Sequence, residues 1–337
     1  MRTADFDYLL PQGRIAQTPT PVRDQSRLLD ARDLSDHLFT DLPILLQPGD
    51  LVVINRSRVR AARLRGFKNE TGGAVEILLL RRVDASRWEA LLRPARRLRA
   101  GAHLVCGPIE AALMSDPIEG AAVVELWCDG DIEEAIAIHG ELPLPPYIRR
   151  RLDDPDRYQT VFAGSVGSAA APTAGLHFTP EVVAALAARQ VPVVEIELEV
   201  GLDTFRPITR DLVEDHVIHR ERYLVPDATA REVNVCRRSK GRIVAVGTTV
   251  VRTLESQSTE TGELLPGRGE TSLYLTPGSP FRVVDLLVTN FHAPRTTLLV
   301  LLAAFMGPEW RTVYDHALAG SYRFLSFGDA MLAARSA

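Results

Sequence analysis

The stretch RIVAVGTTVVRTLES, residues 242–256, decides the class of fold. Its apolar run over 243–246 predicts a strand that is buried on both faces of a sheet. A Gly-Thr-Thr turn over 247–249 ends this strand, and residues 250–256 are predicted to continue as a helix. A buried strand followed directly by a helix is the repeating unit of α/β folds, so the stretch predicts an α/β core.

The same order of elements recurs elsewhere in the chain. An apolar strand over 283–288 is followed by Thr-Asn-Phe-His at 289–292 and by an apolar helix over 297–306. Residues 49–55 predict a turn that enters another buried strand. Ligands of open α/β sheets bind beyond the carboxyl ends of the strands. We therefore expect the polar residues at these strand ends to converge.

A loop of small residues provides a further candidate for the same place. Residues 167–181, GSAAAPTAGLHFTPE, carry His177 shortly before Thr179 and Pro180. Thr179 and Pro180 predict the start of a helix over 180–189, and helix starts favour anions. A tight structural turn is the alternative interpretation of this loop.

The pattern of apolar and polar residues changes between about Arg60 and Pro146. Short alternating segments, such as 74–80, 88–92, 103–106 and 121–127, are separated there by Gly, Pro and Asp turns, which is typical of a β-barrel. We therefore predict a large discontinuous α/β domain, 1–59 and 148–337, with an all-β domain inserted over 60–147.

Charge divides this insert. Residues 60–100 hold eleven Arg or Lys and four Asp or Glu, whereas residues 101–148 hold nine Asp or Glu and no Arg or Lys. The basic half, with Trp88 among its Arg residues, suits a nucleic-acid backbone. Alternatively, strands from both halves interleave and their charges neutralise one another.

Composition predicts an ordinary soluble protein. The 337 residues carry a net charge of −4, and the three Cys are scattered, so no disulfide framework is indicated. The N-terminus lacks the apolar run of a signal peptide, and the longest apolar run, 298–306, is too short to span a bilayer. We expect a cytoplasmic protein with no membrane association.

Missing motifs argue against a nicotinamide site, a nucleoside-triphosphate site, a zinc-peptidase site and the nucleophile elbow of a hydrolase. The chain has no Gly-x-Gly-x-x-Gly, Walker A, His-Glu-x-x-His or Gly-x-Ser-x-Gly sequence. His216 and His219 lie close together, but no further ligands accompany them, so we expect no metal and favour a base or hydrogen-bonding role for His216.

Polar clusters at two further places are candidates for binding. Thr248 and Thr249, with Arg252 one turn later, suit a carboxylate or phosphate, although Arg252 could instead pair with Glu255 on the helix surface. Residues 21–27 and 321–331 mix Arg, Asp and aromatic side chains. Each is either a solvated segment or one that docks near a polar ligand.

Taken together, these stretches resemble one family, the S-adenosylmethionine:tRNA ribosyltransferase-isomerases of queuosine biosynthesis. The matching stretches follow the family's order over nearly the whole chain: 6–11, 23–29, 49–55, 142–148, 158–162, 171–178, 246–249, 289–292, 322–324 and 328–331.

The resemblance implies a discontinuous α/β domain with an inserted antiparallel β-barrel. It also implies that the ribosyl group of S-adenosylmethionine is transferred to the aminomethyl group of a 7-deazaguanine base in tRNA and isomerised to an epoxycyclopentanediol. Adenine and methionine are released. S-adenosylmethionine would be the donor substrate and tRNA the partner of a monomeric enzyme.

The resemblance also assigns the site. A sulfonium makes the adjacent C5′–H acidic, so a general base is needed, and a proton donor would help adenine to leave. We expect acid–base work from His177, orientation by Asn290 and His292, and binding of the methionine carboxylate or a tRNA phosphate by Thr248, Thr249 and Arg252. The other expected substrate-binding residues are Arg23, Asp24, Arg27, Asn55, Arg58, Thr173, Gly175, Thr204, Phe205, His216, Tyr322, Arg323 and Asp329.

The segment 199–205 departs from the family pattern. Glu199 replaces a His, and Asp203 replaces a Gly. Two alternatives therefore stay open: a paralogue that uses a free deazapurine or another small acceptor, and a non-catalytic RNA-binding relative.

Overall fold

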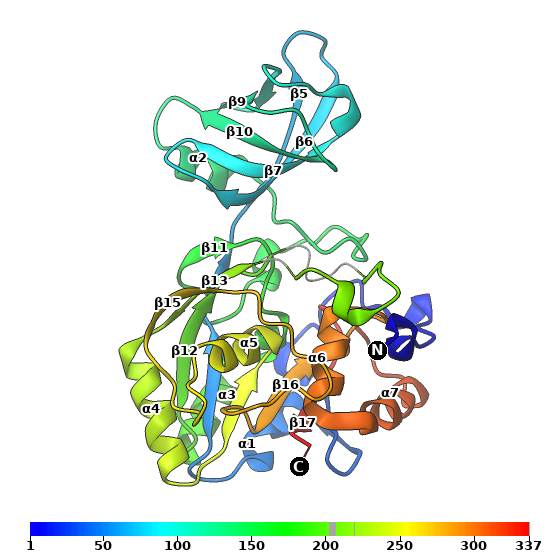
Figure 1. The fold of residues 1–337 in the computed structure, drawn as a ribbon, viewed down its shortest axis with the longest axis vertical. Helices are drawn as coiled ribbons and strands as arrows, with labels where there is room; N and C mark the ends of the chain where they lie inside the picture. Colours follow the sequence, from blue (N-terminus) through cyan, green and yellow to red (C-terminus); the bar gives the residue numbers. More distant parts are fainter. Residues whose placement is uncertain (202–206, 219, 337) are drawn as a thin grey trace. The chain divides into compact units, whose positions relative to one another are not determined.

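The computed structural model describes residues 1–201, 207–218 and 220–336. These residues form two compact units, one made of Met1–Arg58 with Pro145–Ala337 and the other of Val59–Leu144. The first unit is built around a large sheet, and the second is a closed barrel (Figure 1). The expected α/β fold with an inserted antiparallel barrel is confirmed.

Within the described residues, the first unit contains a nine-stranded sheet in the order β15-β13-β12-β3-β14-β16-β17-β1-β2. Its four central strands, β12, β3, β14 and β16, are parallel. Their carboxyl ends therefore meet at one edge of the sheet. The strands are β1 (Arg27–Asp30), β2 (Ser35–Leu38), β3 (Leu51–Asn55), β12 (Val193–Leu198), β13 (Glu221–Val225), β14 (Ile243–Val246), β15 (Gly267–Thr271), β16 (Leu286–Asn290) and β17 (Ala330–Ala334).

Helices and short elements complete this unit. The expected helix over 180–189 is confirmed and ends at Ala188; the Thr179 hydroxyl accepts a hydrogen bond from the backbone N–H of Val182 at its start. The helices are α1 (Leu42–Leu45), α3 (Pro180–Ala188), α4 (Asp227–Arg238), α5 (Thr248–Ser256), α6 (Thr297–Met306) and α7 (Trp310–Ala319), and the short strands at the chain crossings are β4 (Arg58–Val59) and β11 (Val166–Ser168).

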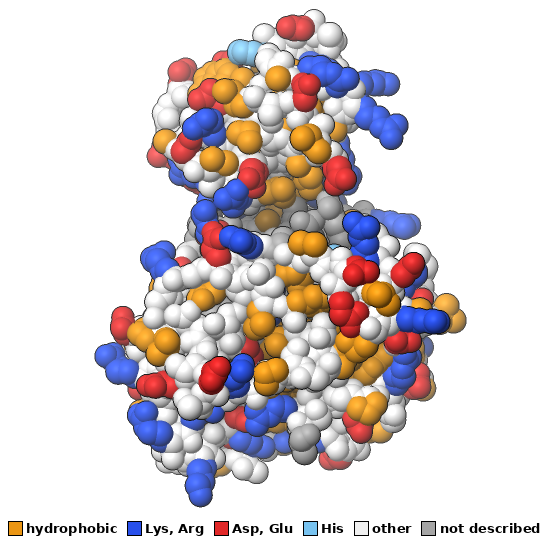
Figure 2. Space-filling model, in the orientation of Figure 1, with side chains coloured by type: hydrophobic (Ala, Val, Ile, Leu, Met, Phe, Trp, Pro, Cys, Tyr) orange, Lys and Arg blue, Asp and Glu red, His pale blue; other side chains and the backbone are white. Residues whose placement is uncertain are grey.

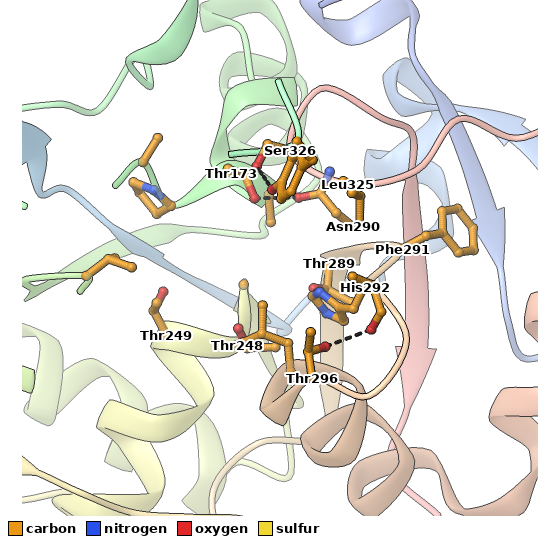
Figure 3. A pocket seen from close by; sticks show the side chains of 18 residues that line it. Thr173, Thr248, Thr249, Thr289, Asn290, Phe291, His292, Thr296, Leu325 and Ser326 are labelled. Carbon is orange, nitrogen blue, oxygen red and sulfur yellow. Dashed lines mark hydrogen bonds between the residues drawn. The ribbon is translucent and has the colours of Figure 1, made fainter. Parts of the chain in front are cut away.

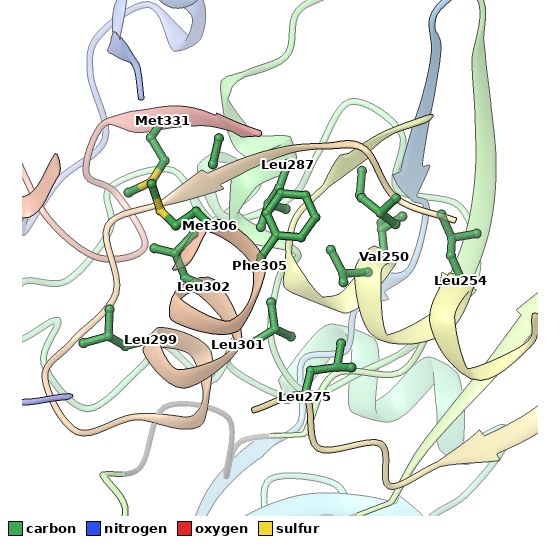
Figure 4. Packing of buried hydrophobic residues seen from close by; sticks show 14 of the residues in the cluster. Val250, Leu254, Leu275, Leu287, Leu299, Leu301, Leu302, Phe305, Met306 and Met331 are labelled. Atoms are coloured by element: carbon green, nitrogen blue, oxygen red, sulfur yellow. The ribbon is translucent and has the colours of Figure 1, made fainter. Parts of the chain in front are cut away.

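Apolar packing fixes the two helices that follow the central strands. Val250 and Leu254 of α5 belong to the same buried cluster as Phe305 of α6 and Leu287 of β16 (Figure 4). β14 is buried along its whole length, as its apolar run predicts. Burial of such side chains contributes about 1.5–3 kcal/mol each, so the starts of α5 and α6 are held firmly against the sheet.

The second unit is a six-stranded antiparallel barrel within the described residues, closed in the order β10-β7-β6-β5-β8-β9. Four of its strands match the alternating segments of the sequence, whereas β5 and β9 were not predicted. Its elements are β5 (Arg63–Lys68), β6 (Ala74–Arg82), β7 (Arg87–Arg93), β8 (His103–Cys106), β9 (Ile109–Leu113), β10 (Ala121–Trp127) and α2 (Ile132–His139).

Trp88 lies in the core of this barrel and not on a nucleic-acid surface. Its side chain is 0% exposed, and the guanidinium groups of Arg60 and Arg82 lie 4.5 and 5.5 Å from its ring centre. Arg82 and Arg60 also pair with Glu133 at 2.9 and 3.6 Å, which joins the basic half of the insert to the acidic half. For these cations, the interleaving alternative is confirmed.

No helix among the described residues has the length and apolar character that a bilayer crossing requires.

Trp88→Ala should destabilise the barrel by about 3–5 kcal/mol, because it leaves a large cavity and removes the ring under two guanidinium groups. Urea unfolding followed by circular dichroism measures the loss. Phe67→Ala is the matched control, because Phe67 is an aromatic residue of the same barrel that is 46% exposed, and we expect a change within about 0.5 kcal/mol. Equal effects of the two substitutions would contradict the core placement of Trp88.

Candidate active site

A pocket that is open to solvent lies at the carboxyl ends of the central strands; its empty space, with the solvent at its mouth included, is about 610 Å³, and we call it the large cavity. Its wall is formed by the residues that follow β14, by those that end and follow β16, and by the loop at 171–174 (Figure 3). The expected convergence is therefore confirmed for the ends of β14 and β16 and for the loop at 171–174, whereas Asn55, at the end of β3, does not line this cavity. Of the residues expected in the site, Thr173, Thr248, Thr249, Asn290 and His292 line this cavity.

The start of α5 presents unpaired donors to the cavity. Gly247 turns the chain with φ +90°, a conformation that favours glycine, and α5 begins at the next residue. The Thr249 hydroxyl is buried and has no hydrogen-bond partner among the described residues. The backbone N–H groups of Thr248 and Thr249 likewise find no acceptor in the described part of the chain. Unpaired donors at a helix start form an anion site.

Asn290, the last residue of β16, is held from three sides. Its Oδ1 accepts a hydrogen bond from the Thr173 hydroxyl at 2.8 Å, and its Nδ2 lies 3.1 Å from His177 Nε2 and 3.4 Å from the Asp329 carbonyl oxygen. A carbonyl oxygen can only accept, so the amide nitrogen must face Asp329 and His177. His177 Nε2 is therefore an acceptor, and its Nδ1 carries the hydrogen that is donated to Ser26 Oγ at 2.7 Å.

His177 is a buried, neutral imidazole. Its ring stacks on Phe39 with the ring centres 5.1 Å apart. Burial lowers its pKa to about 3, and the charges of Arg323 and Arg23 act in the same direction. The low pKa keeps the His177 ring neutral near pH 7. His177 also does not line the large cavity; it lines a smaller one of about 250 Å³.

The smaller cavity adjoins the larger one. Arg23 and Arg157 line it together with His177, and Ser326 lines both cavities. The Arg23 guanidinium donates to the carbonyl oxygens of Leu176 and Asp156 at 3.2 and 2.8 Å. Asn290 lines the large cavity and His177 lines the smaller one, so the hydrogen bond between them joins the two cavity walls.

His292 faces the large cavity directly. Its Nε2 lies 3.0 Å from the Thr289 hydroxyl, and burial lowers its pKa to about 3. Its backbone is fixed by two tyrosines: the N–H donates to Tyr314 Oη at 2.8 Å, and the carbonyl accepts from Tyr8 Oη at 2.5 Å. A neutral imidazole in this position is able to accept a proton from a ligand in the cavity.

Comparison with known proteins identifies the family. The family model for queuosine biosynthesis proteins matches residues 3–333. The chain belongs to this family.

Its relatives match over their full length. The S-adenosylmethionine:tRNA ribosyltransferase-isomerase of Symbiobacterium thermophilum is 47% identical, over 98% of this chain and 99% of the relative. The enzyme of the same name from Moorella thermoacetica is 46% identical over the same shares. The solved structure of the S-adenosylmethionine tRNA ribosyltransferase of Thermotoga maritima is 34% identical, with a TM-score of 0.55, 97% of this chain covered and 99% of that one.

Arg252 does not reach the cavity of this family member. It is buried against Glu221, with which it forms an ion pair, and its Nε donates to the Leu273 carbonyl at 3.1 Å. The expectation that Arg252 binds a ligand in this cavity is therefore not met, and the alternative, pairing with Glu255, is also wrong. Glu255 instead accepts hydrogen bonds from the backbone N–H groups of residues 282–284 at 2.8–3.1 Å.

Other expected residues hold the framework near the cavity. Asn55 joins β3 to β12 by two hydrogen bonds with the backbone of Leu198, at 3.0 and 3.2 Å. Asp24 is buried and accepts from the Thr179 hydroxyl at 2.8 Å. Gly175 lies against Thr160, where a Cβ atom would approach Thr160 Cγ2 to 3.0 Å.

The C-terminal candidates form a second group of framework contacts. Asp329 is buried and accepts from the Arg323 side chain at 3.1 Å and from the Arg27 backbone N–H at 3.2 Å. The Arg27 guanidinium lies 3.7 Å from the ring centre of Tyr322 and pairs with Asp36 at 3.2 Å. These residues anchor the C-terminal segment that carries Ser326.

The remaining expected residues lie away from the cavity or outside the described residues. The exposed Arg58 donates its backbone N–H to the Ser165 carbonyl at 2.7 Å, and His216 packs edge-on against Tyr274. Glu199 is exposed and does not line the cavity. Asp203, Thr204 and Phe205 lie outside the described residues.

Sequence reasoning missed residues that complete the site. Tyr147 Oη lies 2.6 Å from Ser326 Oγ, and both residues line the large cavity. Ser26 Oγ lies 2.7 Å from His177 Nδ1 and accepts its hydrogen. Tyr147, Ser326 and Ser26 all lie in or beside stretches that carry the family resemblance, and this position was the sequence signal that could have found them. Among the described residues, no group of three His, Cys, Asp or Glu is placed to bind a metal.

The neutral state of His177 predicts a pH dependence of stability. Its folded pKa, about 3, lies below the ordinary value of 6.5, so the unfolded chain takes up the proton first. The stability gained from neutral His177 is therefore present above pH 6.5 and is lost as the pH falls towards 3, by about 1.4 kcal/mol per pH unit.

His177→Gln removes this titration. As the pH is lowered from about 6 to 4.5, the unfolding free energy of the variant should therefore fall by about 1.4 kcal/mol per pH unit less than that of the unaltered protein. Urea unfolding at several pH values measures the slope. The exposed His139, changed to Gln, is the control and should leave the slope unchanged. An unchanged slope in His177→Gln would show that the native protein protonates His177.

Proposed function

We propose that this chain transfers and isomerises the ribosyl group of S-adenosylmethionine onto the 7-aminomethyl-7-deazaguanine base of tRNA. The products are epoxyqueuosine-tRNA, adenine and methionine. The observation that carries this proposal is the single cavity that gathers Thr173, Thr248, Asn290 and His292 from separate family motifs. The full-length match to relatives named for this reaction disfavours a non-catalytic relative and a paralogue with another acceptor.

The donor fits the large cavity. The Thr249 hydroxyl and the free N–H groups at the start of α5 hold the methionine carboxylate, in place of the expected Arg252. The described wall carries no Asp, Glu, Lys or Arg side chain. A sulfonium in such a weakly polar site keeps its full effect on the neighbouring C5′–H, because little in the wall screens its charge.

Proton transfer falls to His292 in this arrangement. His292 lines the cavity, whereas both ring nitrogens of His177 are occupied by Ser26 and Asn290. We assign His177 as a positioning residue that orients the Asn290 amide towards the reacting groups. This assignment exchanges the roles expected from the sequence.

We assign the acceptor nucleotide to the side of the site at which the smaller cavity opens. Arg23 and Arg157 give this cavity a cationic wall, and Arg suits a phosphate. Ser326 is shared with the donor cavity, so the aminomethyl group would reach the ribosyl group beside Ser326 and Asn290. We also propose that the enzyme acts as a monomer in the cytoplasm.

Release of adenine tests the function. Purified protein is incubated with S-adenosylmethionine and tRNA that bears the aminomethyl deazaguanine, and adenine is quantified by chromatography. We expect release only when this tRNA is present. Release with the free base alone would support a small acceptor, and no release with either would overturn the proposal.

His292→Gln and His177→Gln should differ sharply. Loss of the proton acceptor lowers kcat by about 10²–10⁴-fold. Gln at position 177 retains one donor for Ser26 and one acceptor for Asn290, so kcat should stay within about tenfold. Single-turnover adenine release measures both variants, and inactivity of His177→Gln beside an active His292→Gln would restore His177 as the acid–base residue.

Thr249→Val removes the unpaired hydroxyl while keeping the side-chain shape. We expect KM for S-adenosylmethionine to rise about tenfold, since a hydrogen bond to a charged group contributes about 1.5–3 kcal/mol. Thr249→Ser keeps the hydroxyl and is the matched control, with KM near that of the unaltered enzyme. Equal KM values in both variants would show that the hydroxyl does not bind the donor.

A further inference from the structure

Five cations of the barrel unit have no carboxylate partner among the described residues. Six of its Arg side chains form ion pairs with Asp or Glu: Arg60, Arg63, Arg65, Arg81, Arg82 and Arg87. The others form no ion pair with any described residue; we call them the arginine face: Lys68, Arg93, Arg96, Arg97 and Arg99.

The strand pairing places the arginine face at one end of the barrel. Lys68 ends β5, and Arg93 ends β7. Both strands run antiparallel to β6, and β5 also runs antiparallel to β8, which begins at His103. The segment 94–102 therefore crosses the end at which β5 and β7 finish. Figure 2 shows Lys and Arg side chains gathered at one end of this unit.

The segment 94–102 is held in place mainly by contacts that do not involve its guanidinium groups. Leu98 is 0% exposed in the barrel core, and the Asp116 carboxylate accepts the Ala100 N–H at 2.8 Å. The Lys68 ammonium bonds the Arg97 carbonyl, and Arg99 Nη1 bonds the Leu98 carbonyl at 2.7 Å. The exposed side chains of Arg93, Arg96 and Arg97 are left for another partner. A fixed backbone lowers the entropy cost of binding.

We propose that the arginine face binds the phosphate backbone of the tRNA, away from the nucleotide that reacts. The identity of the polyanion rests on the proposed function. Like charges left together repel one another and destabilise the fold, which is a cost that phosphate binding offsets. The guanidinium group matches phosphate geometry in two parallel hydrogen bonds. The chain as a whole is acidic, at −4, so attraction to RNA must come from a local surface of this kind.

A matched pair of triple variants tests this surface. R93Q/R96Q/R97Q removes three unpaired charges, and R65Q/R81Q/R87Q removes three exposed but ion-paired charges from the same unit. Dissociation constants for the precursor tRNA are measured between about 50 and 300 mM NaCl. Each lost phosphate contact lowers the slope of log K against log salt by about 0.7–0.9. We expect a slope lower by about 2–3 and affinity about 10²-fold weaker near 0.1 M salt for the first variant only.

The outcomes separate the surface from the reaction. Wild-type affinity in R93Q/R96Q/R97Q, or an equal loss in both variants, overturns the arginine face while leaving the reaction intact. Adenine release at saturating tRNA should stay near wild type in both variants. If the unaltered protein binds this tRNA but never releases adenine, the proposed function fails, and the two slopes still decide the surface. Polyglutamate, measured in the same way, stands for an acidic protein partner. If R93Q/R96Q/R97Q loses polyglutamate binding but keeps tRNA binding, the surface is assigned to an acidic protein and the proposal is overturned.

Discussion

The hydrogen bonds of the Asn290 amide are the interaction on which the site depends. They join three parts of the chain: the end of β16, the loop that carries Thr173 and His177, and the C-terminal segment at Asp329. Because the Asp329 carbonyl fixes the direction of the amide, it also fixes the hydrogen on His177 and, through it, the bond to Ser26. One buried side chain therefore sets the orientation of groups on both cavities.

Buried charge is kept away from the donor cavity. The buried Arg252 pairs with Glu221, and the buried Asp329 pairs with Arg323, so these two buried ions have their counterions within the framework. An unpaired buried charge would be costly, and a paired one is held in a single arrangement. The result is a cavity lined by hydroxyl, amide and imidazole groups. The charges of a sulfonium and a carboxylate would then be the largest in the site, and the helix start would be aligned with one of them.

The local sequence pattern predicted the strands and helices, whereas contacts between residues far apart in the sequence determine the roles of the site residues. The strand over 243–246 and its exit turn follow from apolar periodicity, and the convergence of polar residues follows from parallel topology. The tautomer of His177 could not be predicted, because it depends on hydrogen bonds with Ser26 and Asn290, which are 151 and 113 residues away. Strand β5 was missed since Gly66 interrupts its pattern; a Cβ there would lie 1.9 Å from the Val105 carbonyl oxygen.

Cross-strand register explains why charge counts alone could not decide between a nucleic-acid surface and mutual neutralisation in the insert. Arg65 stands directly opposite Glu76, and Arg81 opposite Glu89, so these cations are neutralised by their strand neighbours. Arg96 and Arg97 lie in the segment between β7 and β8 and have no strand partner to supply a carboxylate. Both interpretations therefore apply to different parts of one run of sequence: ion pairs neutralise the cations within the strands, whereas the last residues of β5 and β7 and the connection after β7 keep their charge.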